Sequence, residues 1–177
     1  TLNLTVRAEV LPTEESATVC FGETYTWNGV AYTATGDYVD TLANVHGCDS
    51  VVTLHLTVLP EVTLPADADV AVGIDVICGN AIDVTEAAAA IQAHVTADPA
   101  APAFEKIVWE VKQADGTWTP LTTDALDGNV TSVTLRYTVY TACEDVISNE
   151  ITLTVEIPTP ENDTEMTNIP AYNNYGG

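Results

Sequence analysis

A run of alternating apolar and polar residues at positions 52–58 constrains the fold of this chain more than any other feature. In VTLHLTV, the valines and leucines point one way along an extended chain, and the residues between them point the other way. This period of two predicts a half-buried β-strand. Similar endings occur at residues 1–6 (TLNLTV) and 151–155 (ITLTV). We therefore expect an all-β chain of tandem small modules, in which residues 1–6 are the last strand of a truncated upstream module.

The first complete module is expected at residues 16–59, after a polar linker at residues 7–15. Between two short runs of strand-forming residues lies Asn28-Gly29. This dipeptide readily adopts the positive φ angles of a type I′ turn, so it predicts a β-hairpin. A module of this size, with about five short strands, buries only a small core.

The second module is expected at residues 60–157. The run EAAAAIQAHV at residues 86–95 predicts one short helix, with a capping box at residues 83–86. A cysteine-bearing strand at residues 70–78, a strand around Trp109, and then a tyrosine-rich strand and a closing strand follow the order of an immunoglobulin-like β-sandwich. We therefore expect such a sandwich, with one short helix.

The four cysteines, Cys20, Cys48, Cys78 and Cys143, fall as one pair in each expected module. Their even number favours disulfides and an oxidising compartment, and no C-x-x-C spacing points to zinc. We expect Cys20–Cys48 to stabilise the first module by roughly 2–4 kcal/mol. We expect Cys78–Cys143 to lie towards one end of the sandwich.

The charge of the chain excludes two classes of partner. Its 26 acidic residues outnumber 4 basic ones, for a net charge of −22. Such a surface repels nucleic acid and anionic membranes. No apolar run approaches the ~20 residues of a membrane-spanning helix. The sequence begins inside a strand-like repeat without a signal peptide, and we expect the natural N-terminus to lie elsewhere.

The sequence offers no catalytic motif. The three histidines have no metal-binding spacing, and no serine lies in a nucleophile elbow. We therefore expect no enzymatic activity and no cofactor.

Calcium is the one metal with candidate ligands, which are Asp67, Asp69, Asp124 and Asp127. Oxygen-rich loops suit this ion, and we expect the four carboxylates in loops that could lie between modules. Ordinary turn acids are the alternative interpretation, because no calcium-binding loop motif occurs.

Two aromatic residues, Trp118 and Tyr140, are candidates for stacking on a sugar ring. The alternative is that Trp118 packs in the core or covers the sandwich edge. Exposure of both rings in one groove would favour sugar binding, and burial of both would oppose it.

The first module resembles a repeat of large surface proteins of Bacteroidota. Residues 20–58 carry a C-x-G-E-x-Y-x-W-N-G run, then D-T-L and finally G-C-D-S-V. The departures from the repeat are Phe21, Thr35 and His46. The resemblance implies export by the type IX secretion system and attachment at the cell surface. We expect residues 158–177, which are rich in proline and lack periodicity, to be a linker or tail before a sorting domain that is absent here.

The same resemblance implies a modification. Bacteroidota O-glycosylate triplets of aspartate, serine or threonine, and an aliphatic residue, and Thr41 and Ser50 lie in such triplets. The alternative is that these residues only shape turns and strand ends.

These observations predict a non-catalytic structural or adhesive module of a secreted cell-surface protein, such as a stalk, adhesin, surface layer or filament. The expected partners are neighbouring modules, other copies of the protein, and host or cell-surface glycans. The alternative function is an accessory carbohydrate-binding module of a secreted glycoside-degrading enzyme.

Overall fold

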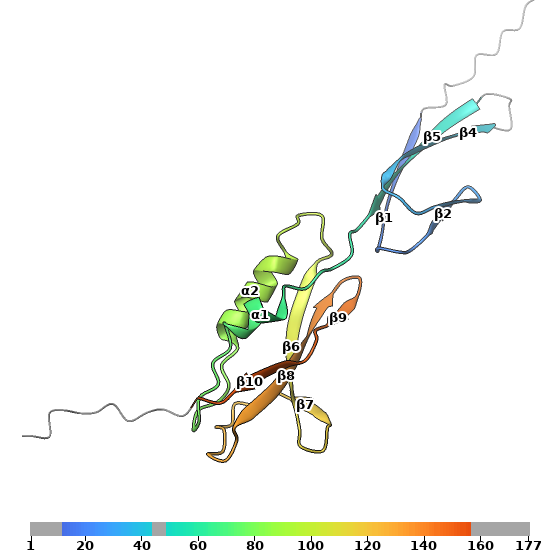
Figure 1. Cartoon of the computed structure of the whole chain (residues 1–177). Coiled ribbons are helices and arrows are strands. Elements are labelled where there is room, and N and C mark those ends of the chain that lie inside the picture. The colour runs from blue at the N-terminus through green and yellow to red at the C-terminus, as the bar shows by residue number, and fades with distance from the viewer. Residues whose placement is uncertain (1–11, 44–48, 157–177) are drawn as a thin grey trace, which may run out of the picture.

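The structure is a computed structural model that describes residues 12–43 and 49–156. These residues form two modules that follow one another along a long axis (Figure 1). Ten strands in three sheets make up most of the described secondary structure, together with two short helices. The expected all-β class is therefore confirmed, with one helix more than predicted.

The first module contains a three-stranded sheet and a small hairpin. Its strands are β1 (Thr13–Val19), β2 (Tyr25–Trp27), β3 (Val30–Tyr32), β4 (Gly36–Ala43) and β5 (Asp49–Val58). In the sheet, β5 lies between β1 and β4, parallel to β1 and antiparallel to β4. The hairpin β2–β3 turns at Asn28 and Gly29, whose φ angles of 48° and 80° are those of the predicted type I′ turn.

The alternation in β5 produces the core of the first module. Leu54 and Leu56 are almost fully buried, and the indole of Trp27 packs against them from the hairpin. Glu15 holds the hairpin in place, because its carboxylate accepts hydrogen bonds from the Tyr25 hydroxyl and the Trp27 Nε1, each at 3.0 Å. Glu15 belongs to β1, so the first strand begins inside the stretch that was predicted to be a linker.

The second module is built on one five-stranded sheet. Its elements are α1 (Asp67–Ala71), α2 (Thr85–Val95), β6 (Phe104–Lys112), β7 (Trp118–Pro120), β8 (Ser132–Thr141), β9 (Asp145–Ile147) and β10 (Ile151–Thr154). The order is β10-β8-β6-β7, and β9 also pairs with β8. The helix predicted from the alanine run is confirmed as α2.

The capping box predicted for α2 does not form. The N-cap residue is Val84, without a side-chain hydrogen bond at the cap. The Asp83 carboxylate instead accepts a 2.8 Å hydrogen bond from the Thr85 backbone amide. Burial of Ala87, Ile91 and Val95 against the sheet therefore accounts for the stability of this helix.

The prediction of a strand at residues 70–78 is wrong. Val70 lies in α1 and is fully buried, and the segment after it makes only isolated bridges, Asp75 to Asp83 and Ile77 to Glu156. Two aspartates in the first turn of α1 favour a helix N-terminus. The strand was predicted from alternating apolar residues alone, and that pattern takes no account of this effect. The second module is thus two-layered like a sandwich, with α1, α2 and this segment packed on the core face of the sheet.

The strand directions carry the chain from one end of the molecule to the other. Because β1 is parallel to β5, both run towards the second module, which follows Val58. Strand β8 runs back to this joint, and β10, antiparallel to β8, runs away from it. The described chain therefore enters at the far end of the first module and leaves at the far end of the second (Figure 1). Two ten-residue strands of about 33 Å each, β5 and β8, set the length of the two modules.

Candidate functional site: the disulfide-bridged joint

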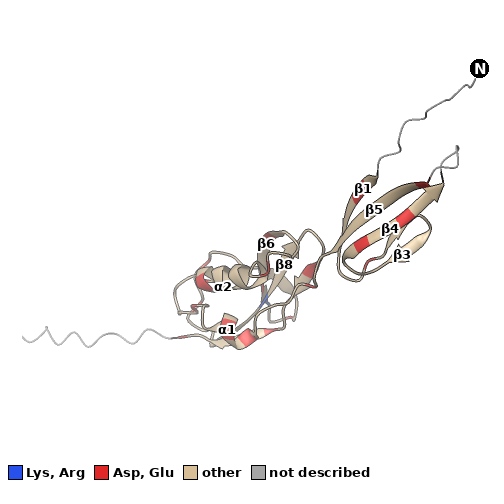
Figure 2. Cartoon of the chain, turned by 90° about the horizontal axis from the view of Figure 1, so that it is seen from above, with Lys and Arg blue, Asp and Glu red and all other residues tan. Residues whose placement is uncertain are grey.

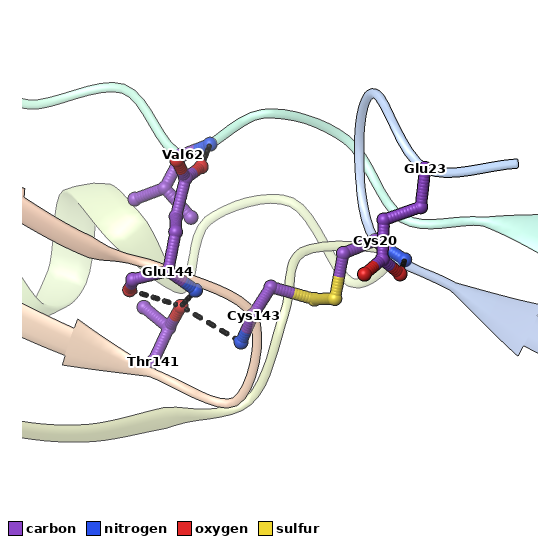
Figure 3. The surroundings of a disulfide bond; sticks show 6 residues. All are labelled: Cys20, Glu23, Val62, Thr141, Cys143 and Glu144. Carbon is purple, nitrogen blue, oxygen red and sulfur yellow. Dashed lines mark hydrogen bonds between the residues drawn. A yellow bond between two sulfur atoms is a disulfide. The ribbon is translucent and has the colours of Figure 1, made fainter.

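A disulfide joins the two modules (Figure 3). Cys20 follows β1 directly, and Cys143 lies in the turn between β8 and β9; their Cα atoms are 5.6 Å apart. Both predicted pairings, Cys20–Cys48 and Cys78–Cys143, are therefore wrong. Cys143 itself lies beyond the end of β8, at the joint.

The parallel pairing of β1 with β5 explains why Cys20 does not pair with Cys48. The register sets Val19 beside Val58, so Cys20 emerges at the joint. Asp49 begins β5 at the opposite end of this module, about 30 Å away. Cys48 lies outside the described residues. Cys78 is half-buried and has no disulfide partner in the described part of the chain.

The linker between the modules is fixed on both sides. The Leu59 amide donates a 2.9 Å hydrogen bond to the Val19 carbonyl of the first module. The Val62 amide donates a 3.0 Å hydrogen bond to Glu144 Oε1 of the second, and the Val62 side chain is buried in that core. Only Pro60 and Glu61 lie between these anchors, and the proline ring fixes its own φ angle. The linker therefore has little freedom to bend.

The turn that carries Cys143 is itself ordered by Thr141. The Thr141 Oγ1 accepts hydrogen bonds from the backbone amides of Cys143 and Glu144, at 3.3 and 3.1 Å, and donates to the Glu144 carbonyl at 2.8 Å (Figure 3). This network sets the positions of both the disulfide and the Glu144 carboxylate. Two tethers, the short linker and the disulfide, thus connect the modules and restrict bending and rotation between them.

The calcium candidates are not brought together. Asp67 and Asp69 lie in the first turn of α1, and the Asp67 carboxylate accepts a 3.1 Å hydrogen bond from Asn149. Asp124 and Asp127 line an open pocket of about 520 Å³ beside the loop before β8. Within residues 12–43 and 49–156, no three histidine, cysteine or acidic side chains lie close enough to share a metal ion.

The two aromatic candidates are half-exposed on the same face of the second sheet, but cations cover both rings. The Arg136 guanidinium lies 4.3 Å from the Trp118 ring centroid, and Lys106 Nζ lies 4.5 Å from that of Tyr140. Trp118 pairs with Lys112 and Tyr140 with Lys106, so the rings lie about 20 Å apart along β6. Neither ring lines the 520 Å³ pocket.

The glycosylation candidates lie on neighbouring strands at the end of the first module away from the joint. Thr41 of β4 is exposed and pairs with Val51, and Ser50 of β5 is half-buried and pairs with Leu42. Because paired positions alternate between faces, Thr41 and Ser50 point to opposite sides of the sheet. Both positions remain predicted sites.

Among the described residues, Tyr137 has the largest pKa shift, and its environment suits a structural role. Its side chain is fully buried, 5.0 Å from the Trp109 ring, and its hydroxyl has no hydrogen-bond partner among the described residues. Burial, and then the negative charge of Asp67, raises the pKa of Tyr137 to about 12. The phenol therefore stays protonated near neutral pH and does not supply a base.

The Tyr137→Phe variant is expected to be more stable than the wild type by about 1 kcal/mol near neutral pH, because it removes an unsatisfied buried hydroxyl. Since the folded-state pKa exceeds the ordinary value of 10.0, the wild type keeps its stability below pH 10 and loses it as the pH rises towards 12. The loss is about 1.4 kcal/mol per pH unit, and the variant lacks it. Urea unfolding at several pH values measures both effects. Tyr140→Phe is the control, and an equal benefit from both variants would contradict the assignment.

The residues that position the joint were not predicted from the sequence. Glu144, Thr141 and Val62 carry no motif, and only the structure brings Glu144 to a residue 82 positions away. The role of Glu15 in holding the hairpin was also not predicted, because Glu15 lies in a polar stretch that was expected to be a linker. The shared face of Lys106 and Lys112 was detectable, because the two lysines are an even number of residues apart on one predicted strand.

No helix in the described part of the chain is long and apolar enough to cross a membrane. No family model, no curated protein and no solved structure matches this chain.

Proposed function

We propose that this chain is a non-catalytic structural segment of an extracellular cell-surface protein, and that it acts as a rigid spacer. The observation that carries the proposal is the joint, where a disulfide and a two-residue linker connect modules through which the chain passes end to end. A spacer needs these two properties, because it must add length and must not collapse at its hinges.

The proposed location follows from the chemistry of the bridge. A disulfide that holds two modules together persists in oxidising surroundings and is rare in the cytosol. The resemblance of residues 20–58 to repeats of surface proteins points the same way. The acidic surface, at a net charge of −22, suits a segment that stays hydrated.

The rigidity of the joint is testable by NMR. We expect residual dipolar couplings from both modules of the oxidised chain to fit one alignment tensor, because the modules tumble as one body. In the Cys20→Ser variant, with one tether left, we expect two tensors of different magnitude. Cys78→Ser is the matched control and should behave as the wild type. Two different tensors in the oxidised wild type would refute the rigid spacer.

The location is testable on intact cells of the producing organism. An antibody raised against residues 12–156 should label unpermeabilised cells, because the proposed segment lies outside them. Labelling that appears only after permeabilisation would overturn the proposed location. That result would not affect the proposed rigidity of the joint, which the NMR experiment tests separately.

A further inference from the structure

The basic residues of the second module gather on one face of its sheet. Lys106 and Lys112 lie on β6 and Arg136 on β8, and they are the three basic side chains, histidines aside, that the structure describes. Their positions alternate with the buried Trp109, Tyr137 and other core residues, so they point away from the core. Together with Trp118 and Tyr140 they form the aromatic-basic face.

Contacts within this face hold its side chains in place. Arg136 stacks on Trp118 and forms a 2.7 Å ion pair with Glu110, and both charged groups are largely shielded from solvent. Lys112 Nζ lies 5.6 Å from the Trp118 ring and 2.7 Å from Glu150. A surface that is already ordered loses little side-chain entropy on binding. Tryptophan, tyrosine and arginine are also the residues that most often dominate protein interfaces.

The opposite layer of the same module has complementary chemistry. Residues 62–95 contain no lysine or arginine. Asp67 and Asp69 lie on α1, Asp75 follows it, and Val72 between them is 84% exposed. Figure 2 shows acidic residues on α1. This acidic-apolar patch of Asp67, Asp69, Val72 and Asp75 offers carboxylates to the face, where Lys106 has no ion pair with a described residue, and an aliphatic group to the half-exposed rings.

We propose that the aromatic-basic face of one chain binds the acidic-apolar patch of a second copy. The face and the patch belong to opposite layers, so the contact is heterologous and can continue from copy to copy. Copies of net charge −22 repel one another at long range, but at physiological ionic strength this repulsion is screened beyond about 8 Å. The proposal deepens the structural role above and rests on it, since it names the surface through which spacers would assemble side by side.

The chain provides a selective chemical probe, because its only two lysines, Lys106 and Lys112, both lie on the face. A carbodiimide joins lysine amines to carboxylates in direct contact. A mixture of ¹⁴N- and ¹⁵N-labelled oxidised full-length chains distinguishes cross-links between copies from those within one. We expect mixed-isotope peptides that join Lys106 or Lys112 to Asp67, Asp69 or Asp75. The link from Lys112 to Glu150 within one chain serves as the internal standard.

Two variants test the contact without removing a reactive group. Val72→Ser on the patch and Arg136→Gln on the face should each lower the yield of mixed-isotope links at least threefold relative to the internal standard. Thr152→Ser, on the same sheet, is the control and should leave the yield unchanged. The proposal is overturned if only same-isotope links form, if mixed links spread over exposed carboxylates without preference, or if neither variant lowers the yield. A rigid joint measured by NMR would survive that failure, so the two proposals fail separately.

Discussion

The Cys143→Ser variant is expected to lose about 4 kcal/mol of unfolding free energy in the first module. When the second module is folded, it holds the first module at two points, Cys20 through the disulfide and Val62 through the linker. The unfolded first module is then a closed loop of about 40 residues, and closing such a loop destabilises the unfolded state by about 4 kcal/mol. The first module depends on this bridge because its described core has three buried residues, against fourteen in the second. We therefore expect one cooperative transition in the wild type to separate into two in the variant.

Urea unfolding followed by residue-resolved NMR measures the two modules separately. Signals of Leu54 and Leu56 should report the early transition in Cys143→Ser, and signals of Leu135 and Ile91 the later one. Cys20→Ser should reproduce the loss. Cys48→Ser is the decisive comparison, because a bridge within the first module would make this variant, and not Cys143→Ser, the unstable one.

The Gly73→Ala variant is expected to lose about 3 kcal/mol of unfolding free energy in the second module. A Cβ atom at this position would lie 2.7 Å from the backbone nitrogen and 2.9 Å from the Cα of Ala87. Both neighbours are backbone atoms in the first turn of α2, so relief requires the helix and the Gly73 segment to move apart. Such a shift would also lengthen the 3.0 Å hydrogen bond from the Ala87 amide to the Gly73 carbonyl.

The matched control for this variant is Gly128→Ala. A Cβ atom there meets only Cys78 Sγ, at 3.9 Å, which is an ordinary contact. We expect a change within about 0.5 kcal/mol, as for most surface substitutions. Thermal unfolding of the two variants gives the comparison. A Gly73→Ala protein as stable as Gly128→Ala would show that α2 does not pack as closely on the Gly73 segment as the structure has it.

Local patterns in the sequence predict the local elements well. The Asn28-Gly29 turn, the alternation in β5 and the alanine-rich helix each depend on residues close together in the chain, and each is found where it was expected. The short helix α1 was missed because five residues are too few for a helical period to appear.

The pairing of the cysteines depends on contacts that no local pattern encodes. An antiparallel neighbour is the usual partner of a strand in a small module, but β1 pairs with β5 in parallel across the intervening hairpin. Because of this parallel pairing, Cys20 lies at the joint and not in the body of its module. The link between Glu144 and Val62 depends in turn on how the modules meet. The even spacing of Lys106 and Lys112 predicts that these two lysines share a face, while only the pairing of β6 with β8 brings Arg136 to the same face.

The connectivity of Cys20 tests the central claim most directly. The native protein is digested without reduction, with free thiols blocked at acidic pH, and the peptides are identified by mass spectrometry. We expect one peptide pair that joins Cys20 to Cys143 and separates into its two components on reduction. A pair that joins Cys20 to Cys48 would contradict it, because the modules would then share only the short linker and the rigid joint would be lost.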